Sequence, residues 1–564
     1  MSLRSDTLHK PCGQMKGQGL GTQIPDTQLM ELILRLQKAI EDYVMQLETR
    51  RLWQDVVPEE GRHNEATKEQ KASLIHSMYQ VVNLLQSGAT GGPELPLSRL
   101  SLDSSGDVGG RHQAQSSRQP DELSYQLNHL EAAFVSNVLS NHGNDITASY
   151  SSFVQTFVTY LKDNYDEDKN TSGFINLSIT ENKLCTGLIT ERLSQSDMNY
   201  IDDTLLQYSD YKGQANLREE VARFLTDYCK APAPLDPENV VVVNACLPVF
   251  SALSMVLCDP GEAFLVPSPS YPGFSLTAHL YSKVELIYVH LNSEVTAENS
   301  RLFQLTVGKL ENALHEAQLK GQKVKGLMLI NPQNPLGDVY SRDSLKEYLE
   351  FAKRHTLHVI VDEIYLETVF DESITFHSVL SLESLPDPNR THLIWGTGKL
   401  FGSAGFHLGA LYTYNKEVAS AVSIYGILHS IPGIIQHRLC RLLQDREWID
   451  KVYLPTKHSR LQAAHRYVTS ELKALKVPFF NCGAGLNVWM NLKEYLEPCT
   501  FEKELLLHQR FLDHKLVLSP GKFYMYNEPG WFRLTYSNKM PHLKVAMHRF
   551  SRALAEQKQA LAEK

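Results

Sequence analysis

Short, unbroken apolar runs alternate with amphipathic stretches through the middle of this chain. Such runs are typical of strands that are buried on both faces of a sheet. The runs that predict strands are Val240–Val243, Ala263–Val266, Val284–Val289, Gly326–Ile330, His358–Val361, His392–Trp395 and Ala410–Tyr412. Apolar residues with helical spacing predict helices at 217–228, 247–257, 308–319 and 342–355. This alternation predicts an α/β fold with a doubly wound sheet.

The same pattern divides the main body of the chain into two domains. Residues 216–434 hold the predicted strands and form the expected large domain. Residues 125–215 and 435–555 mix helical and strand signals, which predicts a smaller α+β domain built from both segments, with a tail at 556–564. A length of 564 residues is consistent with about three to four structural units.

The N-terminal part of the chain has a different pattern. Residues 1–25 and 87–124 are polar and rich in Gly, Ser or Pro, and we expect both to be disordered, the second as a linker. Residues 26–86 carry amphipathic stripes at 27–48 and 74–85, which predict a helical extension. The two helices could form a hairpin without chemistry, dock on the main body or bind a partner.

Composition and charge exclude several functional classes. Hydrophobic residues make up 42% of the chain, the net charge is −9 and the pI is about 6.2, so nucleic acid is not expected as a partner. No run approaches the roughly 20 apolar residues of a membrane span, and the N-terminus lacks the apolar core of a signal peptide. The eight cysteines show no C-x-x-C spacing. We therefore expect reduced thiols, no metal site and a cytoplasmic protein.

A lysine and an aspartate follow two of the predicted strands at their carboxyl ends. Lys399 ends the segment WGTGK, and Asp362 begins the segment DEIY. Ligands of open α/β sheets bind at this edge. Pyridoxal phosphate (PLP) needs a lysine that joins it covalently and a carboxylate that pairs with its pyridine nitrogen, so that the ring acts as an electron sink. The pair therefore predicts a PLP site.

Further segments resemble one family, the PLP-dependent enzymes of fold type I. Within the class I/II aminotransferases, the resemblance is to the 1-aminocyclopropane-1-carboxylate (ACC) synthases, and it covers about residues 130–550. The matching segments are INL at 175–177 with ENKLC at 181–185, YSDYKG at 208–213, DPGEAFLVP at 259–267, NPQNPLG at 331–337, DEIY at 362–365, the Lys399 segment and GWFR at 530–533. The resemblance implies a large, doubly wound mixed sheet domain joined to a smaller α+β domain.

The resemblance also implies roles around the cofactor ring. Lys399 matches the catalytic lysine, which forms the Schiff base and moves the Cα proton; burial readily neutralises a lysine amine. Asp362 matches the partner of the ring nitrogen, and Asn334 and Tyr365 match the donors to the ring hydroxyl oxygen. Tyr271 matches an aromatic residue that stacks on the ring, a contact worth about 0.5–1.5 kcal/mol beyond burial. A buried core tyrosine is the alternative interpretation of Tyr271.

Other matched residues concern the substrate and the phosphate. Arg533 matches the arginine that binds the substrate α-carboxylate, which a guanidinium can do with two hydrogen bonds. Glu181 matches a substrate-contacting carboxylate, although a solvated glutamate is equally consistent. Tyr211 matches a tyrosine that reaches the phosphate in the neighbouring subunit, which implies a homodimer. Ala245 and Cys246 occupy the turn at a helix N-terminus, where backbone N–H groups and the helix dipole favour an anion.

The phosphate-binding positions depart from the family pattern. The family has Ser-x-Ser-Lys followed by an arginine, but here Gly396 and Gly398 lack the hydroxyls and His407 replaces the arginine. The turn NACLP at 244–248 also lacks the threonine side chain that is usual there. Hydrogen bonds to charged groups contribute roughly 1.5–3 kcal/mol each, so these losses predict a cost on the order of 5 kcal/mol, or several-thousand-fold in affinity. A protonated His407 would recover part of this loss.

Three hypotheses for function follow. The first is an ACC synthase-like protein that is inactive or strongly impaired, because its cofactor is poorly held. The second is an active PLP enzyme acting on an amino acid, a transaminase or a β-lyase, because the residues that act on the ring remain. ACC synthesis itself is less favoured, since Ser270 replaces the first of two tyrosines usual in the family. The third is an interaction protein that works through the N-terminal helices.

Overall fold

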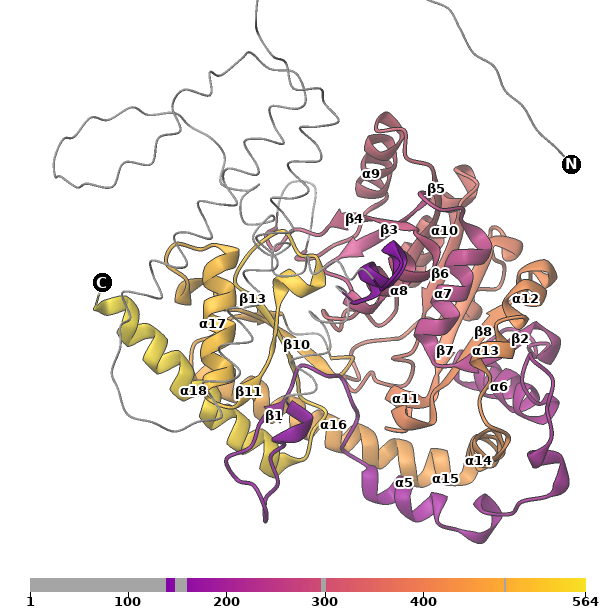
Figure 1. Cartoon of the computed structure of the whole chain (residues 1–564), viewed down its shortest axis with the longest axis horizontal. Coiled ribbons are helices and arrows are strands. Elements are labelled where there is room, and N and C mark those ends of the chain that lie inside the picture. Colours follow the sequence, from indigo (N-terminus) through magenta and orange to yellow (C-terminus); the bar gives the residue numbers. More distant parts are fainter. Residues whose placement is uncertain (1–137, 148–159, 296–300, 481–482, 564) are drawn as a thin grey trace, which may run out of the picture. The chain divides into compact units, whose positions relative to one another are not determined.

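The structure is a computed structural model that describes residues 138–147, 160–295, 301–480 and 483–563 (Figure 1). The predictions for residues 1–124, which include the helices at 27–48 and 74–85 and the linker, lie outside these residues. The interaction hypothesis built on those helices therefore stays a prediction. The elements below belong to one compact unit that begins at residue 119.

A seven-stranded mixed sheet forms the centre of the large domain. Its strands are β2 (Val240–Asn244), β3 (Ala263–Ser268), β4 (Glu285–His290), β5 (Val324–Ile330), β6 (His358–Asp362), β7 (Thr391–Gly396) and β8 (Leu408–Thr413). They follow the order β2-β8-β7-β6-β5-β3-β4. Strand β8 is antiparallel to both of its neighbours, and the other neighbouring strands are parallel. The predicted strands are confirmed to within two residues at either end.

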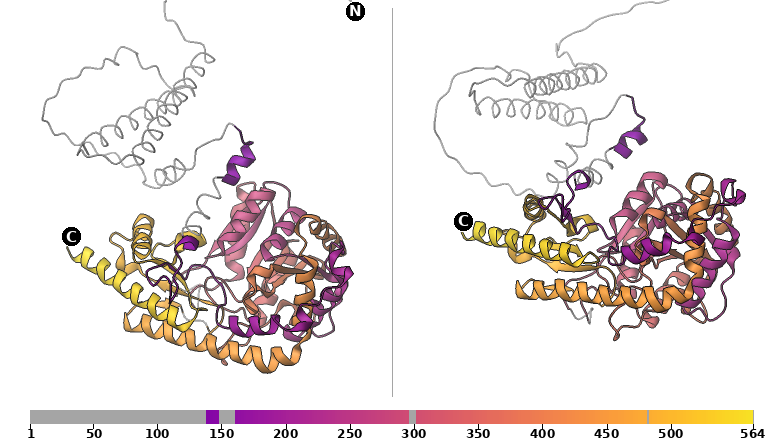
Figure 2. Two further views of the ribbon diagram at one scale, coloured as in Figure 1. Left: turned by 60° about the horizontal axis from the view of Figure 1, so that its bottom comes forward. Right: turned by 90° about the horizontal axis from the view of Figure 1, so that it is seen from below.

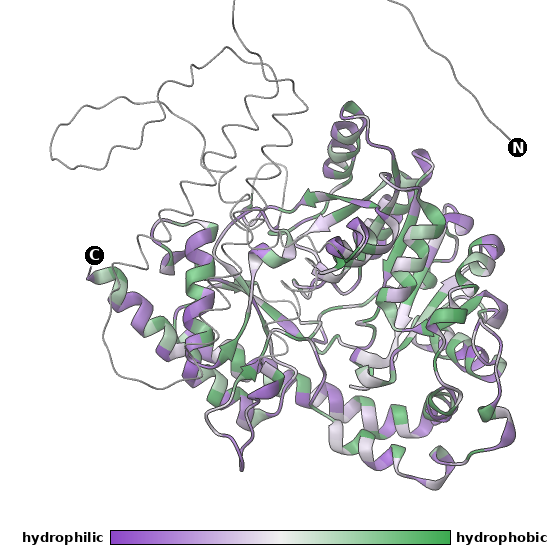
Figure 3. Cartoon of the chain, viewed as in Figure 1, coloured by the Kyte–Doolittle hydropathy of each residue, from purple (hydrophilic) through white to green (hydrophobic). Residues whose placement is uncertain are grey.

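Helices cover both faces of this sheet. Alternate residues along a strand point to opposite faces, and they belong to two different apolar clusters. Val240 and Val242 belong to one cluster, and Val241 and Val243 belong to the other. The first cluster includes residues of α6 (Ala215–Tyr228), α9 (Val307–Leu319), α10 (Arg342–Arg354) and α14 (Gly433–Gln444). The second includes residues of α7 (Cys246–Leu257), α8 (Pro272–Ser282) and α12 (Lys416–Ser423). Figure 3 shows mostly hydrophobic strands between helices striped with both colours, so the doubly wound arrangement is confirmed.

Local sequence signals fix the ends of individual helices. Helix α10 begins after Ser341, whose Oγ accepts a hydrogen bond from the backbone N–H of Ser344 at 3.1 Å. Its last turn carries Lys353 and Arg354, whose positive charges interact favourably with the negative end of the helix dipole. The helix predicted at 342–355 therefore has the cap and the charges that its bounds require.

A four-stranded antiparallel sheet forms the smaller domain. Its order is β12 (Ser519–Pro520), β13 (Trp531–Thr535), β10 (Asn487–Asn491) and β9 (Phe479–Phe480). The helices of this domain are α16 (Leu454–Ala474), α17 (Phe501–Asp513) and α18 (Met540–Ala562). Helices α16 and α18 lie side by side (Figure 2). Helix α18 continues past residue 555, where the pattern placed a tail, because its last residues are good helix formers.

Shorter elements occur in both domains. Strand β1 (Ile175–Asn176) pairs in parallel with β11 (Leu516–Val517), so a segment from early in the unit joins one from its end. The short helices are α5 (Thr186–Leu193), α11 (Thr397–Leu400), α13 (Gly426–His429) and α15 (Arg446–Trp448), followed by a π-helical turn at Ile449–Tyr453. Single 3₁₀ turns lie at Ser196–Met198, Asp203–Leu206, Pro237–Asn239, Val379–Ser381, Pro388–Arg390, Ala404–Phe406, Lys493–Tyr495 and Gly521–Tyr524. None of the described helices combines the length and the apolar character needed to cross a membrane.

Candidate functional site

The candidate site begins at the carboxyl ends of β6 and β7, which run in parallel. Asp362 is the last residue of β6, and Lys399 follows β7 in the single-turn helix α11. The side chain of Asn182 donates to the backbone oxygens of Lys399 and Leu400, at 3.2 and 3.3 Å. Tyr453 Oη also donates to the Leu400 oxygen, at 2.7 Å. These contacts hold the lysine-bearing turn in place from two other parts of the chain.

The ionisable groups at this edge have displaced pKa values. Burial, helped by the positive charge of Arg533, lowers the pKa of Lys399 to about 8. Its Nζ donates to the backbone oxygen of Thr180. Burial raises the pKa of Asp362 to about 7, against the opposing effects of a hydrogen bond from Ile364 N at 3.0 Å and of Lys399. Burial therefore favours the neutral forms of both groups.

Arg533 extends from the middle of β13 in the smaller sheet toward the loop after β5. Its Nη1 donates to Asn334 Oδ1 at 2.8 Å, and its Nη2 donates to the backbone oxygen of Ser178. Its guanidinium carbon lies 4.9 Å from the centre of the Tyr524 ring. Its Nε is buried and has no hydrogen-bond partner, although buried donors are normally paired. One donor of the guanidinium, the Nε–H group, is therefore available to another acceptor.

Two tyrosines complete this part of the site. Burial raises the pKa of Tyr271 to about 12, and it also raises the pKa of Tyr365. Both phenols therefore stay protonated at neutral pH and can donate a hydrogen bond. Tyr271 precedes α8 and meets Phe274 edge to face, with ring centres 5.5 Å apart. The charge of Arg533 influences the pKa values of Lys399 and of both tyrosines, so these groups lie close together.

The turn at Ala245 and Cys246 starts helix α7. Ala245 has φ +80° and ψ 162°, a conformation that is nearly exclusive to glycine and costs on the order of 1–3 kcal/mol. Cys246 is buried, which raises the pKa of its thiol. The third residue of the helix is Pro248, which has no N–H group. The N-terminus of α7 therefore presents the N–H groups of Cys246 and Leu247 and lacks the next one.

Gly396 has no room for a side chain. A Cβ atom there would lie 2.5 Å from the Leu408 oxygen and 2.8 Å from Cys246 Sγ. At Gly398 a Cβ would lie 3.3 Å from the Ala404 Cα. This contact is short, but a small shift of the neighbouring atoms would relieve it. The thiol of Cys246 therefore occupies the space into which a residue 396 side chain would extend, a relationship that the sequence does not reveal.

The remaining predicted residues are exposed. His407 has a left-handed backbone, with φ 52°, and its side chain lies on the surface. Glu181 is exposed and forms an ion pair with Lys183 at 3.1 Å, and it also raises the pKa of Lys399. Tyr211 lies in the turn before α6 with 48% of its surface exposed.

Sequence reasoning missed several residues at this edge. Tyr524, beneath the Arg533 guanidinium, stands in no recognised segment. Asn244, the last residue of β2, has a buried Oδ1 without a partner next to the Ala245 turn. Both depend on tertiary packing, and no local pattern marks them. Within the described ranges, no cluster of His, Cys, Asp or Glu is arranged to hold a metal ion.

Comparisons with known proteins show the family and the fold of this chain. The family model for aminotransferase class I and II matches residues 172–550. The Homo sapiens protein named "Probable inactive 1-aminocyclopropane-1-carboxylate synthase-like protein 2" is 61% identical over 564 residues, which is 100% of this chain and 99% of that one. The Bos taurus "1-aminocyclopropane-1-carboxylate synthase-like protein 1" is 52% identical over 78% of this chain and 89% of its own length. The solved aromatic aminotransferase from Pyrococcus horikoshii OT3 matches the fold with a TM-score of 0.58, at 21% identity over 71% of this chain and 98% of that one.

Proposed function

We propose a function from one premise: this chain belongs to the class I and II aminotransferase family. The proposal is that Lys399 still binds PLP, that the cofactor is weakly held, and that the protein is inactive or strongly impaired in ACC synthesis. A relative with the words "probable inactive" in its name, at 61% identity, supports this proposal. The main support for this proposal is the contrast between the residues that would contact the cofactor ring and those that would contact its phosphate.

The residues that would contact the cofactor ring and the substrate fit the cofactor. PLP, when bound, supplies an electron sink for negative charge at the Cα atom of an amino acid. Lys399, with a pKa lowered to about 8, has an amine that is readily neutral, so it can attack an aldehyde and can accept a proton. The buried Asp362 carboxyl would gain stability as an anion beside a protonated ring nitrogen. Arg533 and its unpaired Nε would bind the carboxylate of an amino acid.

The residues that would contact the cofactor phosphate, here called the phosphate side, fit the cofactor poorly. Gly396 offers no hydroxyl and has no space for one. Pro248 removes one N–H group from the start of α7, and His407 is exposed on a separate turn. Three groups that would each donate to a phosphate dianion are thus missing or displaced. At roughly 1.5–3 kcal/mol for each hydrogen bond to a charged group, we expect an affinity for PLP that is lower by a factor of several thousand.

Titration of the purified protein with PLP tests this proposal. The visible absorption band of the lysine-bound cofactor should appear only at high PLP concentration, and borohydride trapping should label the peptide that contains Lys399. The variant Lys399→Ala is the control and should show neither band nor label. Tight binding with rapid turnover of S-adenosylmethionine to ACC would contradict the proposal.

A second candidate function is catalysis on a different amino acid, a transamination or a β-elimination. The lowered pKa of Lys399 and the unpaired Nε of Arg533 favour it, because such a reaction needs a neutral amine and a donor for the substrate carboxylate. Screening keto-acid acceptors and cysteine conjugates at saturating PLP would test it. Turnover that disappears in both Lys399→Ala and Arg533→Ala would support the idea, and no product from any donor would end it.

We also propose that the protein is a homodimer. Apolar side chains are exposed on the segment before α6 and on and beside α13: Tyr200, Ile201, Leu206, Tyr208, Tyr211, Ile424, Ile427 and Leu428. The two stretches touch, since a Cβ at Gly426 would meet the Tyr211 backbone oxygen at 2.1 Å. Exposed apolar side chains gathered on neighbouring segments are typical of an interface. A second copy is the occupant we favour, because a two-fold axis would match the surface with itself.

We propose a cytoplasmic location. The six cysteines of the described ranges are free thiols, and five of them are buried. Free thiols persist in a reducing compartment. Fluorescence of a tagged full-length chain in cells would test the location, and signal confined to an organelle would contradict it.

A further inference from the structure

The N-terminal end of the long helix α16 makes hydrogen bonds to two segments of the candidate site. Tyr453, just before the helix, donates from Oη to the backbone oxygen of Leu400 at 2.7 Å. Lys457, one helical turn later, donates from Nζ to the backbone oxygen of Glu367. Both donor side chains are buried. The proposed function assigns no role to either of them.

The two acceptors belong to the segments that carry the predicted ring-binding residues. Leu400 is next to Lys399 in the turn Thr397–Leu400, which is called the lysine turn below. Glu367 lies in the stretch Asp362–Thr368, which is called the aspartate loop below. The strands that precede the two segments, β7 and β6, are parallel neighbours. One helix end therefore contacts two adjacent segments at the ligand-binding edge of the sheet.

The bond from Lys457 holds a strained point of the aspartate loop. Glu367 has a left-handed backbone with φ 63°, which is unfavourable for a residue that has a side chain. His458 Nε2 lies 2.9 Å from the same Glu367 oxygen. Burial and the charge of Lys457 lower the pKa of His458 to about 4, so its ring is neutral, and Nε2 carries the proton because a carbonyl oxygen only accepts. Two donors on one oxygen thus fix the loop at this residue.

Packing alone does not explain an amine at position 457. The Lys457 side chain is only 1% exposed, and burial lowers the pKa of its amine to about 8, against the opposing charges of Glu367 and Cys185. Removing a lysine amine from water is costly, and an apolar side chain of similar length would fill the same space without that cost. The hydrogen bond to the aspartate loop is the contact that an apolar side chain could not make.

The helix start that carries these donors has an unusual backbone. Residues Ile449–Tyr453 form a π-helical turn between α15 and α16. Such turns add a residue within a helix and are frequent at functional sites. Because each helical residue rotates the chain by about 100°, the added residue changes the direction in which Tyr453 points relative to α15. The π turn thus helps to direct the Tyr453 hydroxyl toward the lysine turn.

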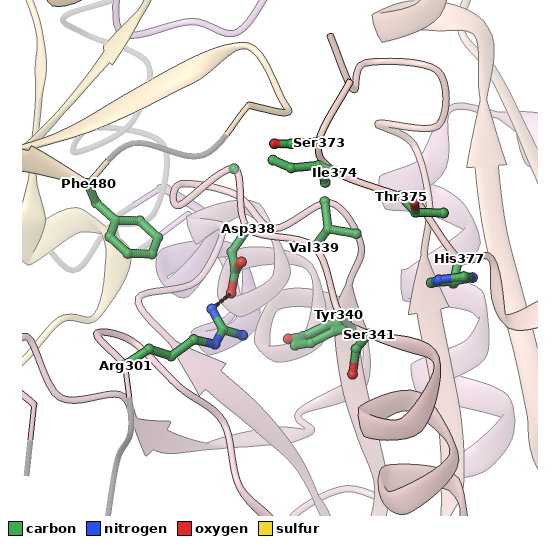
Figure 4. Close-up of a pocket in the computed structure, with 11 residues that line it drawn as sticks. Arg301, Asp338, Val339, Tyr340, Ser341, Ser373, Ile374, Thr375, His377 and Phe480 are labelled. Carbon is green, nitrogen blue, oxygen red and sulfur yellow. Dashed lines mark hydrogen bonds and ion pairs between the residues drawn. The ribbon is translucent and has the colours of Figure 1, made fainter. Parts of the chain in front are cut away.

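The chain that continues from the aspartate loop has less packing to hold it. Residues 373–377 form one wall of a cavity of about 440 Å³, and Figure 4 shows Ser373, Ile374 and Thr375 along this wall. A stretch that borders a cavity has few neighbouring atoms on that side, so packing restrains it less. The position of the aspartate loop therefore depends more strongly on the bonds at Glu367.

We propose that Tyr453 and Lys457 are positioning residues of the candidate site. Together they hold the lysine turn and the aspartate loop at the separation that a bound pyridine ring requires. This inference rests on the proposed function, because PLP is the group that would contact both Lys399 and Asp362. The two donors act as a unit, since the separation of the two segments is no longer fixed when either bond is lost.

Titration with pyridoxal tests the inference, because pyridoxal lacks the phosphate and reports the ring contacts alone. Lys457→Met removes the amine at similar volume, and Tyr453→Phe removes only the hydroxyl. We expect each variant to weaken pyridoxal binding by about three- to tenfold, which corresponds to one hydrogen bond. The double variant should lose less than the product of the two single losses. Unchanged affinity in both single variants, or a double loss equal to that product, would overturn the inference.

A control on the same helix separates positioning from general destabilisation. Leu472 is fully buried near the other end of α16, so Leu472→Ala should lower the free energy of unfolding and leave the affinity for pyridoxal unchanged. Lys457→Gln keeps an N–H donor and should recover part of the affinity that Lys457→Met loses. A loss of affinity in Leu472→Ala as large as that in Lys457→Met would overturn the inference.

Hydrogen exchange of the chain without cofactor separates this inference from the proposed function. Amide exchange in the aspartate loop should become faster in Lys457→Met, and exchange in the lysine turn should become faster in Tyr453→Phe. Leu472→Ala should accelerate neither segment selectively. This pattern would support the positioning role even if the wild type bound no pyridoxal, and only the proposed cofactor would then be refuted. Unchanged exchange in both segments would overturn the positioning role itself.

Discussion

Among single residues, Gly396 limits what mutation could restore to the phosphate side of the proposed site. We expect Gly396→Ser to lower the free energy of unfolding by about 1–3 kcal/mol, because the new side chain meets Cys246 Sγ and the fixed Leu408 oxygen. For the same reason it should not raise the affinity for PLP. Urea denaturation and PLP titration would measure both effects. Gly405→Ser is the matched control, since a Cβ at Gly405 would have no neighbour within 4 Å. Tighter PLP binding at unchanged stability would contradict this expectation.

The residue types at the site could be predicted from the sequence, but their relationships could not. Lys399 and Asp362 are recognisable because each follows a buried strand, and strand ends form a common edge. The contact between Arg533 and Asn334 joins two domains, and the overlap of Cys246 with the space beside Gly396 joins two distant turns. Such contacts depend on packing distances of a few tenths of an ångström. No periodicity encodes them.

At the scale of elements, the start of helix α7 would determine how the proposed site holds an anion. Pro248→Ala would restore an N–H group in the first turn, where it is free of the helix ladder. We expect the dissociation constant for PLP to fall by about tenfold, as for one added hydrogen bond to a charged group. Pyridoxal, which lacks the phosphate, should bind as before. Pro541→Ala at the start of α18 is the control and should change neither value. An equal gain for pyridoxal would show that the phosphate is not involved.

Three strands of the large sheet share a buried chain of hydrogen bonds. His358 Nδ1 lies 2.9 Å from His392 Nε2, and His392 Nδ1 lies 2.8 Å from Thr413 Oγ1. Burial lowers the pKa of His392 to about 3 and that of His358 to about 4, from an ordinary value of 6.5. At these two histidines the unfolded chain therefore binds more protons than the folded one below pH 6.5, and their contribution to stability falls as the pH decreases.

We expect His392→Gln to remove part of this acid sensitivity. Each such histidine contributes about 1.4 kcal/mol per pH unit between the unfolded and the folded pKa. Buried carboxyls with raised pKa values, such as Glu363, act with the opposite sign, so the informative quantity is the difference between the wild type and the variant. That difference should grow as the pH falls from about 6.5 to 5 in urea denaturation. The exposed His548→Gln serves as the control, and parallel curves for His392→Gln and the wild type would refute the argument.

For the whole molecule, the large domain is the part that the hydrophobic pattern predicts best. Its strands are continuous apolar runs because helices cover both faces, so every strand leaves a signal of its own. The smaller sheet contains the two-residue strands β9 and β12, which are too short for a pattern. Their pairing is set by β10 and β13, which place Arg533 opposite the large domain. The part of the site that the proposal assigns to the substrate thus depends on the less predictable domain.

The proposed dimer makes the strongest prediction at this scale. Leu428 on α13 is 79% exposed and lies within the apolar surface defined above, so Leu428→Glu would bury a charge at the interface. We expect the variant to be a monomer in analytical ultracentrifugation at concentrations where the wild type is a dimer. Leu319→Glu, at the end of α9 and 74% exposed, is the matched control and should remain dimeric. If Tyr211 also reaches the partner's phosphate, the monomeric variant should bind PLP more weakly and pyridoxal equally well. A wild type that stays monomeric at high concentration, or a dimer that persists in Leu428→Glu, would move the interface elsewhere.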